Sequence, residues 1–565
     1  RIKIIIIGMI VTVIFLILSI TNGISTQTIK KMDNTLAVNI FPKLSKNTIP
    51  VVYEGDIVSC DITGTPLYWT INNQSHHYTF DKNNNPIIFD PEQTPLDQQT
   101  VILTVYALDK FGKEVFSTKE IILKKLFFGD IHWHSNFSDG DYDIEDIYKN
   151  AKKDRYLDFT AATDQKEAIP PLLYKLKKLI KKRRPNEIKD PWDISKKVAK
   201  KYYEEGVFST ILGFEWSGSN MYPGGKKYTP HGCEDVSHIN FYYRELYDKA
   251  DHYSTFDKKT YDEILTAMND EYNSGHKNIG YPHHPQGKIY LFSSTLVNNF
   301  EIFKDIKFLQ RFLYDFTTNF TFLAKDVQNK QAINKIIRGA EIFSRWGAAI
   351  GPYSNIDIPW PYYKDNPEDG VVCANKKEAW AENAMWEWSE NVDKNAKFAL
   401  QMGSDTHHTT RPGSAFLWRK KTSGITAAYA VHNKREEIWD AMNDCDIYGT
   451  QLLKIKANAR FDNKMALGKW IDCSKSYLKI DISAMSAVER NDYSGKKIKP
   501  YDYPEDDPLD YPIKEIYIIK KDTEKGQPWC KVINHTVFNK KNEDNLVTLS
   551  FTDRKSTRLN SSHYS

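Results

Sequence analysis

The chain has 565 residues, of which 41% are hydrophobic and 13% aromatic, so it has room for about three or four globular domains. Its formal net charge is only +4, from 77 basic and 73 acidic residues, which argues against a nucleic-acid partner. Its six cysteines include no Cys-x-x-Cys pair and are too sparse for a disulfide-stapled scaffold.

The N-terminal segment is strongly apolar. Residues 4–20 form an uninterrupted hydrophobic run that follows Arg1 and Lys3. This pattern predicts a signal peptide or an N-terminal membrane anchor over residues 1–26. We therefore expect an extracytoplasmic protein, either secreted or periplasmic, or held at a membrane by this one segment if it is not cleaved.

Residues 27–124 show short alternating strands separated by turn clusters. Strand patterns occur at 51–62, 66–73, 100–109 and 114–124. Strands of this length, broken by residues such as Asn, Asp, Gly and Pro, are typical of a β-sandwich. We predict an immunoglobulin-like domain here, with no catalytic cluster of its own.

The pattern changes after residue 124, where strands begin to alternate with helical stretches such as 143–153. The strand patterns are at 126–134, 157–164, 211–216, 237–243, 278–284, 340–344 and 397–405. This alternation predicts a β/α barrel over residues 125–450. Residues 451–552 return to alternating strands and predict a second β-domain. Residues 553–565 resemble a translated sequencing adapter, and we expect no natural domain there.

Polar side chains gather where the barrel strands end. His132 and His134 are two positions apart, so in a strand they point to the same side. Each could by itself be a surface or hydrogen-bonded histidine. Because strand ends converge on one rim of a barrel, imidazoles and carboxylates there predict a divalent-metal cluster. The other polar residues at strand ends are Asp139, Asp164, Gln165, Glu215, His238, His283, His284, Asp405, His407 and Arg411.

Several of these segments resemble the motifs of the PHP (polymerase and histidinol phosphatase) superfamily, and in particular its domain-of-unknown-function branch. The segments are, in chain order, HWHSNFSDG, ATDQ, GFEW, SHIN, HHP and GSDTHH. The resemblance covers about residues 126–450 and extends to the flanking β-domain at 451–552. It implies a distorted seven-stranded β/α barrel, here flanked by two small all-β domains. It also implies two or three Zn, Mn or Fe ions and hydrolysis of a phosphoester.

The resemblance also implies which residues bind the metals. Glu215 would be the bridging carboxylate, and His283 and His284 remain alternatives for one ligand position. The chain departs from the family at Gln165, where a histidine is usual, and glutamine is a poor ligand for transition metals beside imidazole. The expected metal ligands are His132, His134, Asp139, Glu215, His238, His283, His284, Asp405 and His407.

The expected function is that of an exported or membrane-anchored metal-dependent hydrolase, a phosphoesterase acting on a small-molecule or glycan-type phosphoester. Arg411 would grip the phosphate oxygens, and Asp164 would orient a ligand histidine. Two alternatives stay open. They are a carbonyl hydrolase of the amidohydrolase kind on the same metals, and a non-catalytic surface binding protein with a degenerate barrel. The expected catalytic residues are Glu215, Asp405, Arg411 and His284.

Overall fold

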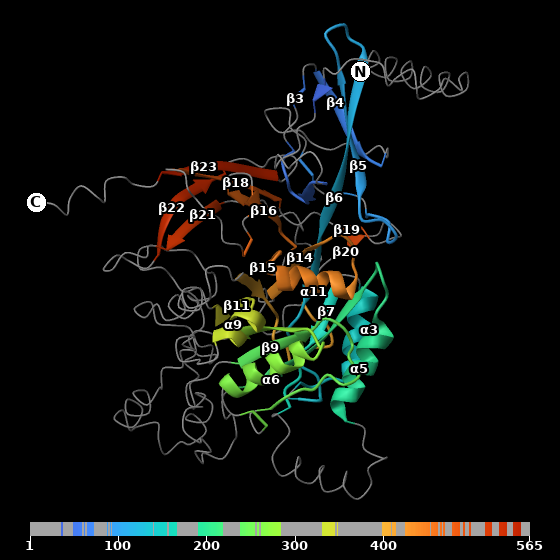
Figure 1. Ribbon diagram of the computed structural model, residues 1–565, viewed down its shortest axis with the longest axis vertical. Helices are drawn as coiled ribbons and strands as arrows, with labels where there is room; N and C mark the ends of the chain where they lie inside the picture. Colours follow the sequence, from blue (N-terminus) through green and yellow to red (C-terminus); the bar gives the residue numbers. More distant parts are fainter. Residues whose placement is uncertain are drawn as a thin grey trace, which may run out of the picture. The chain divides into compact units, whose positions relative to one another are not determined.

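The computed structural model divides into two compact units, which are described separately (Figure 1). The first consists of residues 1–43, 57–87 and 102–120, and the second contains the rest of the chain. The residues whose structure is described are 36–37, 49–58, 61–62, 65–72, 87–88, 91, 93–138, 140–154, 157–166, 190–217, 238–254, 257–258, 261–283, 330–344, 347–348, 398–407, 409–413, 424–451, 454–461, 464–465, 467–468, 477–485, 490–491, 497–498, 513, 515–521, 530–538 and 546–554.

The first unit contains short antiparallel strands, as the sequence predicts. A turn joins two of them, and in it Asp109 Oδ1 accepts hydrogen bonds from the backbone N–H groups of Phe111 and Lys113, at 2.8 and 2.9 Å. Gly112 completes this turn with a φ of +74°, which glycine adopts at no steric cost. The immunoglobulin-like domain itself stays a prediction. The strands of this unit are β1 (Leu36–Ala37), β3 (Asp61–Ile62), β4 (Thr65–Ile71), most of β5 (Val101–Leu108) and the first part of β6 (Glu114–Asp130).

The second unit contains a large mixed sheet. Its neighbouring strands follow the order β10-β9-β8-β7-β6-β14-β15, and β2 pairs with β6. Strands β6, β7 and β8 run parallel to one another, whereas β9, β10, β14 and β15 join the sheet by antiparallel pairing. The bounds are β2 (Val51–Tyr53), β7 (Phe159–Ala162), β8 (Ser209–Trp216), β9 (His238–Tyr243), β10 (Asn278–His283), β14 (Gly424–Ala430) and β15 (Ile447–Gln451).

A separate sheet of three strands contains two of the strands predicted for the barrel. Strand β11 (Gly339–Ser344) pairs in parallel with β13 (Ala399–Met402) and antiparallel with β12 (Gly347–Ala348). Among the described strands the hydrogen-bond ladders therefore do not close a seven-stranded barrel. A short apolar run predicts a buried strand but not its direction, so the antiparallel pairs could not be read from the sequence. The architecture is mixed α/β with a large mixed sheet.

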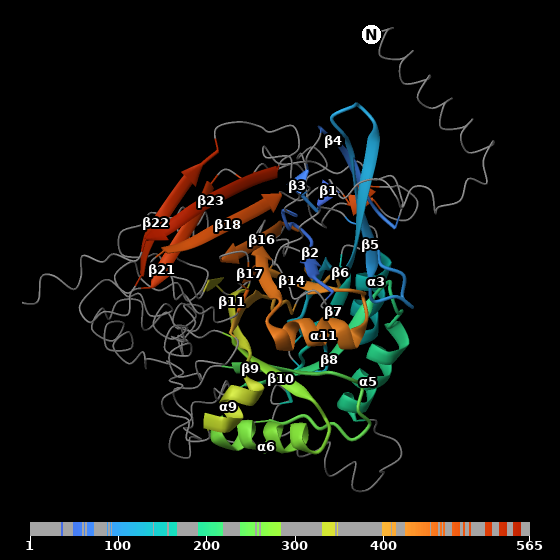
Figure 2. The ribbon, with the colours of Figure 1, turned by 45° about the horizontal axis from the view of Figure 1, so that its top comes forward.

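Helices pack on the large mixed sheet of the second unit in adjacent pairs. Helix α3 lies beside α5, and α6 lies beside α9 (Figures 1 and 2). The helix predicted at 143–153 is confirmed as α3. No helix in the described part of the chain is both long and apolar enough to cross a membrane. The bounds are α3 (Ile144–Asp154), α5 (Pro191–Tyr202), α6 (Tyr261–Asn273), α9 (Lys330–Ile336) and α11 (Arg435–Asp444).

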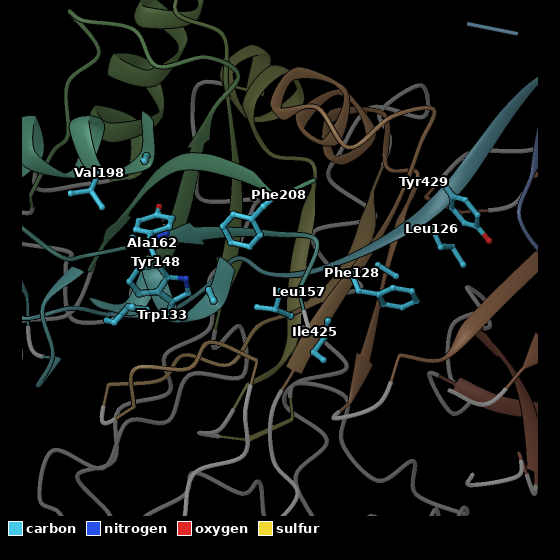
Figure 3. Close-up of a cluster of buried hydrophobic side chains, with 14 of the residues drawn as sticks. Leu126, Phe128, Trp133, Tyr148, Leu157, Ala162, Val198, Phe208, Ile425 and Tyr429 are labelled. Carbon is cyan, nitrogen blue, oxygen red and sulfur yellow. Dashed lines mark hydrogen bonds between the residues drawn. The ribbon is translucent and has the colours of Figure 1, made fainter. Parts of the chain in front are cut away.

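Trp133 anchors the segment that follows β6 in the core (Figure 3). Its ring packs edge-on against Tyr148 of α3, with the ring centroids 5.1 Å apart, and its Nε1–H donates to Thr160 Oγ1 at 2.8 Å. Because neighbouring side chains in an extended segment point to opposite sides, burial of Trp133 turns His132 and His134 away from this core. The packing of one tryptophan thus fixes the direction of both histidines.

The C-terminal region forms further antiparallel sheets, in agreement with the strands predicted after residue 450. Four strands follow the order β17-β16-β18-β23, and β21 pairs with β22. The sheet is tied to the segment before β6 by buried Asp56, whose carboxylate accepts hydrogen bonds from Asn458 and Arg460. The bounds are β16 (Lys456–Phe461), β17 (Lys464–Met465), β18 (Tyr477–Met485), β19 (Arg490–Asn491), β20 (Lys497–Ile498), β21 (Glu515–Lys521), β22 (Cys530–Val537) and β23 (Leu546–Arg554).

Candidate metal centre

Four buried side chains direct nitrogen and oxygen atoms at one point, and we call them the first group: His132, His134, Glu215 and Asp405. The Nε2 atoms of His132 and His134 lie 3.2 and 3.1 Å from Glu215 Oε2. The same two atoms lie 3.3 and 3.1 Å from Asp405 Oδ1. Ligands about 2.0–2.1 Å from a tetrahedral cation are about 3.3–3.4 Å from one another. The spacing and the donor atoms therefore fit a divalent transition metal.

A second group uses the other oxygen of the same carboxylate. Glu215 Oε1 lies 2.5 Å from His238 Nδ1 and 3.3 Å from His283 Nε2. His238 begins β9 and His283 ends β10, and the antiparallel register places the two residues directly opposite each other. The carboxylate of Glu215 is thus shared between two ligand groups, which is the arrangement expected of a bridging ligand in a two-metal site.

The backbone at Asp405 adopts a conformation that is rare for residues other than glycine. Its φ is +51°, in the left-handed region. The surrounding hydrogen bonds hold it there, since the Asp405 N–H donates to His132 O at 2.7 Å and the His134 N–H donates to Thr406 O at 2.9 Å. Conformations of this kind persist where the neighbouring structure enforces them, often at functional sites. Here the result is a carboxylate aimed at both histidines.

Buried Asp130 joins the end of β6 to the loop that carries Asp405. Its carboxylate accepts backbone hydrogen bonds from His132, Ser404 and Gly413, at 3.1, 3.0 and 2.7 Å. Burial raises the pKa of Asp130 to about 6, although these hydrogen bonds favour the charged form. The sequence prediction did not include this residue, and its position in the FGDIHWH segment just before the histidines was the available signal.

Asp164 orients a histidine indirectly rather than by direct contact. Ser138 Oγ donates to Asp164 Oδ1 at 2.7 Å and lies 3.2 Å from His134 Nδ1. With its own proton given to the carboxylate, the serine oxygen can accept the Nδ1–H of His134, which leaves Nε2 for the metal. Asp164 also accepts hydrogen bonds from the backbone and side chain of Ser135, both at 2.7 Å. Asp164 therefore acts on His134 through Ser138.

Gln165, at which the chain departs from the PHP pattern, contacts the shared carboxylate. Its Nε2 donates to Glu215 Oε1 at 2.6 Å, and Ser217 Oγ donates to the same oxygen at 3.0 Å. Both contacts stabilise the negative charge and the orientation of Glu215. In this position Gln165 is a hydrogen-bond donor to Glu215.

The remaining predicted site residues are placed less centrally or lie outside the described ranges. The ring of His407 stacks on that of His134, with centroids 4.2 Å apart, and its Nδ1 donates to the Asp405 carbonyl at 3.0 Å. His407 belongs to neither ligand group as the described residues define them. Arg411 is exposed on the loop after Asp405. Asp139 and His284 lie outside the described residues.

The sequence prediction missed Glu341, a buried carboxylate inside strand β11. Glu341 Oε2 lies 2.9 Å from His132 Nδ1, the ring nitrogen on the other side from Glu215 and Asp405. The segment 340–344 was predicted as a strand, but no site residue was assigned to it. A glutamate in the middle of such a strand was the signal, because carboxylates are rarely buried unless they are paired.

The charges of the two groups depend on one another. Burial disfavours the charged form of His132, but Asp405, Glu341 and a hydrogen bond to Glu215 hold the pKa of His132 well above its ordinary value. Burial likewise disfavours the charge on Glu215, yet His238 and hydrogen bonds from His132 and His134 hold the pKa of Glu215 well below its ordinary value. At neutral pH the metal-free centre therefore contains an ionised Glu215 next to a protonated His132.

Metal binding to the first group should weaken as the pH falls. A cation needs the Nε2 lone pair of His132, so it must displace the proton that the raised pKa keeps there. We expect the affinity for Zn²⁺ to rise by up to about tenfold per pH unit, over the pH range in which His132 is protonated in the absence of metal. Competition with a chelator of known proton affinity, from about pH 6 to about pH 8, measures this dependence. An affinity independent of pH would contradict it.

Comparison with known proteins supports the resemblance only in part. Residues 376–542 match the family model described as "Protein of unknown function (DUF3604)". No curated protein matches the chain. Among solved structures, the chain is similar to a two-domain protein from Bacteroides vulgatus ATCC 8482 that contains a predicted PHP-like metal-dependent phosphoesterase. The identity is 12% and the TM-score 0.29, over 64% of this chain and 77% of that chain. The branch predicted from the sequence motifs is therefore matched by a family model over residues 376–542.

Proposed function

We propose that the chain is a metal-dependent hydrolase with two divalent cations, and that its substrate is a phosphoester. The observation that carries this proposal is the carboxylate of Glu215, one oxygen of which faces the first group and the other the second group. A carboxylate shared in this way can hold two cations, one on each oxygen. A single structural cation would leave the histidines of the other group without a function.

The chain's own residues prepare the centre for hydrolysis. When bound, a pair of cations supplies Lewis acidity and an activated water at neutral pH. His132, His134 and Asp405 would hold one cation, and His238 and His283 the other. Gln165 and Ser217 keep Glu215 ionised and oriented by donating to Oε1. Because these side chains are already in place before the substrate binds, little reorganisation is required to reach the transition state.

The choice of a phosphoester rests on the resemblance of the motifs to the PHP superfamily. Arg411 supports it, because it follows Asp405 in the same loop and a guanidinium matches two phosphate oxygens. We also propose the finer features that accompany the resemblance and the apolar N-terminal run. These are closure of the strands into a distorted barrel, a small-molecule or glycan-type substrate, and a location outside the cytoplasm.

Metal analysis with a substrate panel tests the proposal. We expect about two transition-metal ions per purified chain, and hydrolysis of aryl phosphates that a chelator removes and added metal restores. Faster hydrolysis of aryl esters or amides than of aryl phosphates would favour the carbonyl hydrolase. Less than about one ion per chain, with no turnover, would favour a binding protein with a degenerate centre.

A further inference from the structure

A chain of buried polar side chains ends on the imidazole of His132. Thr426 Oγ1 of β14 lies 3.1 Å from Gln401 Oε1 of β13 and 2.8 Å from the carbonyl oxygen of Met402, and its one proton can be donated to either. Gln401 Nε2 donates in turn to Glu341 Oε2 of β11 at 3.2 Å, and this oxygen lies 2.9 Å from His132 Nδ1. All four side chains are at most 2% exposed. Polar groups this deeply buried are costly unless each has a partner, and here each link supplies the partner of the next.

We infer that Glu341 is a positioning residue, which holds His132 with a proton on Nδ1 and so leaves Nε2 to face the metal. The role of Glu341 depends on the metal centre of the proposed function. A neutral imidazole has one donor and one acceptor nitrogen, and a carboxylate beside Nδ1 selects the form in which Nδ1 is the donor. The same contact fixes the plane of the ring and makes the opposite nitrogen a better ligand.

Gly403 leaves room for the contact between Glu341 and His132. A methyl group added at Gly403 would lie 2.5 Å from His132 Cβ and 2.6 Å from Glu341 Oε2. Both distances are far shorter than van der Waals contact, so a residue with a side chain would push the carboxylate and the imidazole apart. Glycine at this position is therefore part of the arrangement that brings Glu341 to His132.

A direct ligand role for Glu341 is the competing interpretation, because Glu341, His132 and His283 also lie close enough to hold an ion. His132 would then have to bind one cation through Nε2 and another through Nδ1. That requires the imidazole to lose both protons, which is far less favourable than to keep one on a carboxylate. A positioning role needs only the proton that a neutral imidazole already has.

The test is Zn²⁺ binding by Glu341→Gln in the full chain, measured by chelator competition. We expect the affinity to fall about 10- to 100-fold, while the number of Zn²⁺ ions bound at saturation stays the same. The visible spectrum of the Co²⁺-loaded variant should also change, because the electron donation from His132 changes. The matched control is Glu54→Gln, since Glu54 is an equally buried glutamate that contacts Lys456 Nζ at 2.8 Å and lies outside both ligand groups. This control should bind Zn²⁺ as the wild type does.

Two outcomes would overturn the inference. Affinity within about threefold of the wild type would show that the contact does not matter, and loss of one Zn²⁺ at saturation would show that Glu341 is a ligand. Neither readout depends on turnover. A wild-type chain that binds Zn²⁺ but hydrolyses nothing would refute the proposed function, and the Glu341→Gln measurement would still decide the positioning role.

If Glu341→Gln does not fold, a second variant still tests the positioning role of Glu341. Gln401→Met removes the hydrogen bond to Glu341 and keeps a side chain of similar volume. By itself it should lower Zn²⁺ affinity about threefold or more with no bound ion lost at saturation, and wild-type affinity would contradict the positioning role. Where Glu341→Gln does fold, the loss should be smaller than in that variant. In the Glu341→Gln background it should cause no further loss, because Gln401 acts through Glu341. A full additional loss in the double variant would show that the two residues act independently, which contradicts the chain of contacts.

Discussion

Replacement of Glu215 by Gln is expected to abolish tight metal binding and hydrolysis together. The substitution keeps the size of the side chain but removes the charge that faces His132 and His134 through one oxygen and His238 and His283 through the other. Outer hydrogen-bond partners of metal ligands alone are worth about 10- to 100-fold in affinity. Loss of a ligand shared by both groups should therefore exceed about 100-fold for Zn²⁺, and turnover should fall with it.

A histidine–glutamate pair elsewhere in the chain provides the control. His432 Nδ1 lies 2.7 Å from Glu437 Oε1, so Glu437→Gln changes the same kind of histidine–carboxylate contact outside the two ligand groups. This variant should keep wild-type Zn²⁺ affinity and turnover. Far-ultraviolet circular dichroism and a thermal melt establish that both variants are folded. Turnover by a folded Glu215→Gln protein at more than about a tenth of the wild-type rate would refute the proposed centre.

Replacement of Gly403 by Ala should damage stability and metal binding at once. The new methyl group would lie 2.5 Å from His132 Cβ and 2.6 Å from Glu341 Oε2, and both side chains are buried with little space to move. Overpacking of this kind costs about 1–3 kcal/mol of the free energy of unfolding. Because the displaced atoms belong to a ligand and its hydrogen-bond partner, Zn²⁺ affinity should also fall by at least about tenfold.

The control Gly275→Ala separates the loss of stability from the loss of Zn²⁺ affinity. Gly275 has a φ of +104°, so alanine is strained there, but its added methyl group would have no atom within 4 Å. We expect this control to lower the free energy of unfolding by about 1 kcal/mol or more and to leave Zn²⁺ affinity unchanged. Denaturant unfolding and Zn²⁺ titration of both variants give the comparison. Wild-type Zn²⁺ affinity in Gly403→Ala would show that the centre tolerates displacement of His132.

Local sequence patterns were sufficient to predict which side chains share a face. Alternation in an extended segment predicts that His132 and His134 point together, and the structure places both Nε2 atoms beside the carboxylate of Glu215. The helix after residue 143 and most strands of the second unit were also predictable, because hydrophobic periodicity is a local property. That these side chains bind metal stays a prediction.

Strand direction and strand partners were not predictable, because they depend on distant segments. His238 was assigned to the end of a strand, but it begins β9, and antiparallel pairing with β8 and β10 returns it to Glu215. Strand β14 was missed altogether. Its sequence, GITAAYA, is rich in small residues and gives a weak strand signal. The structure explains this composition, since a methyl group at Gly424 would lie 2.3 Å from the carbonyl oxygen of Gly403.

The separation of the candidate ligand residues along the chain has a consequence for how the protein would acquire the proposed metal ions. His132 is 83 positions from Glu215 and 209 from Glu341, so the centre is complete only after β6, β8 and β11 have come together. A growing or partly folded chain therefore gains little from a cation. We expect metal to slow unfolding rather than to speed folding, because it binds the finished native state. The supply of metal would then set how long a folded molecule survives proteases, apart from any effect on catalysis.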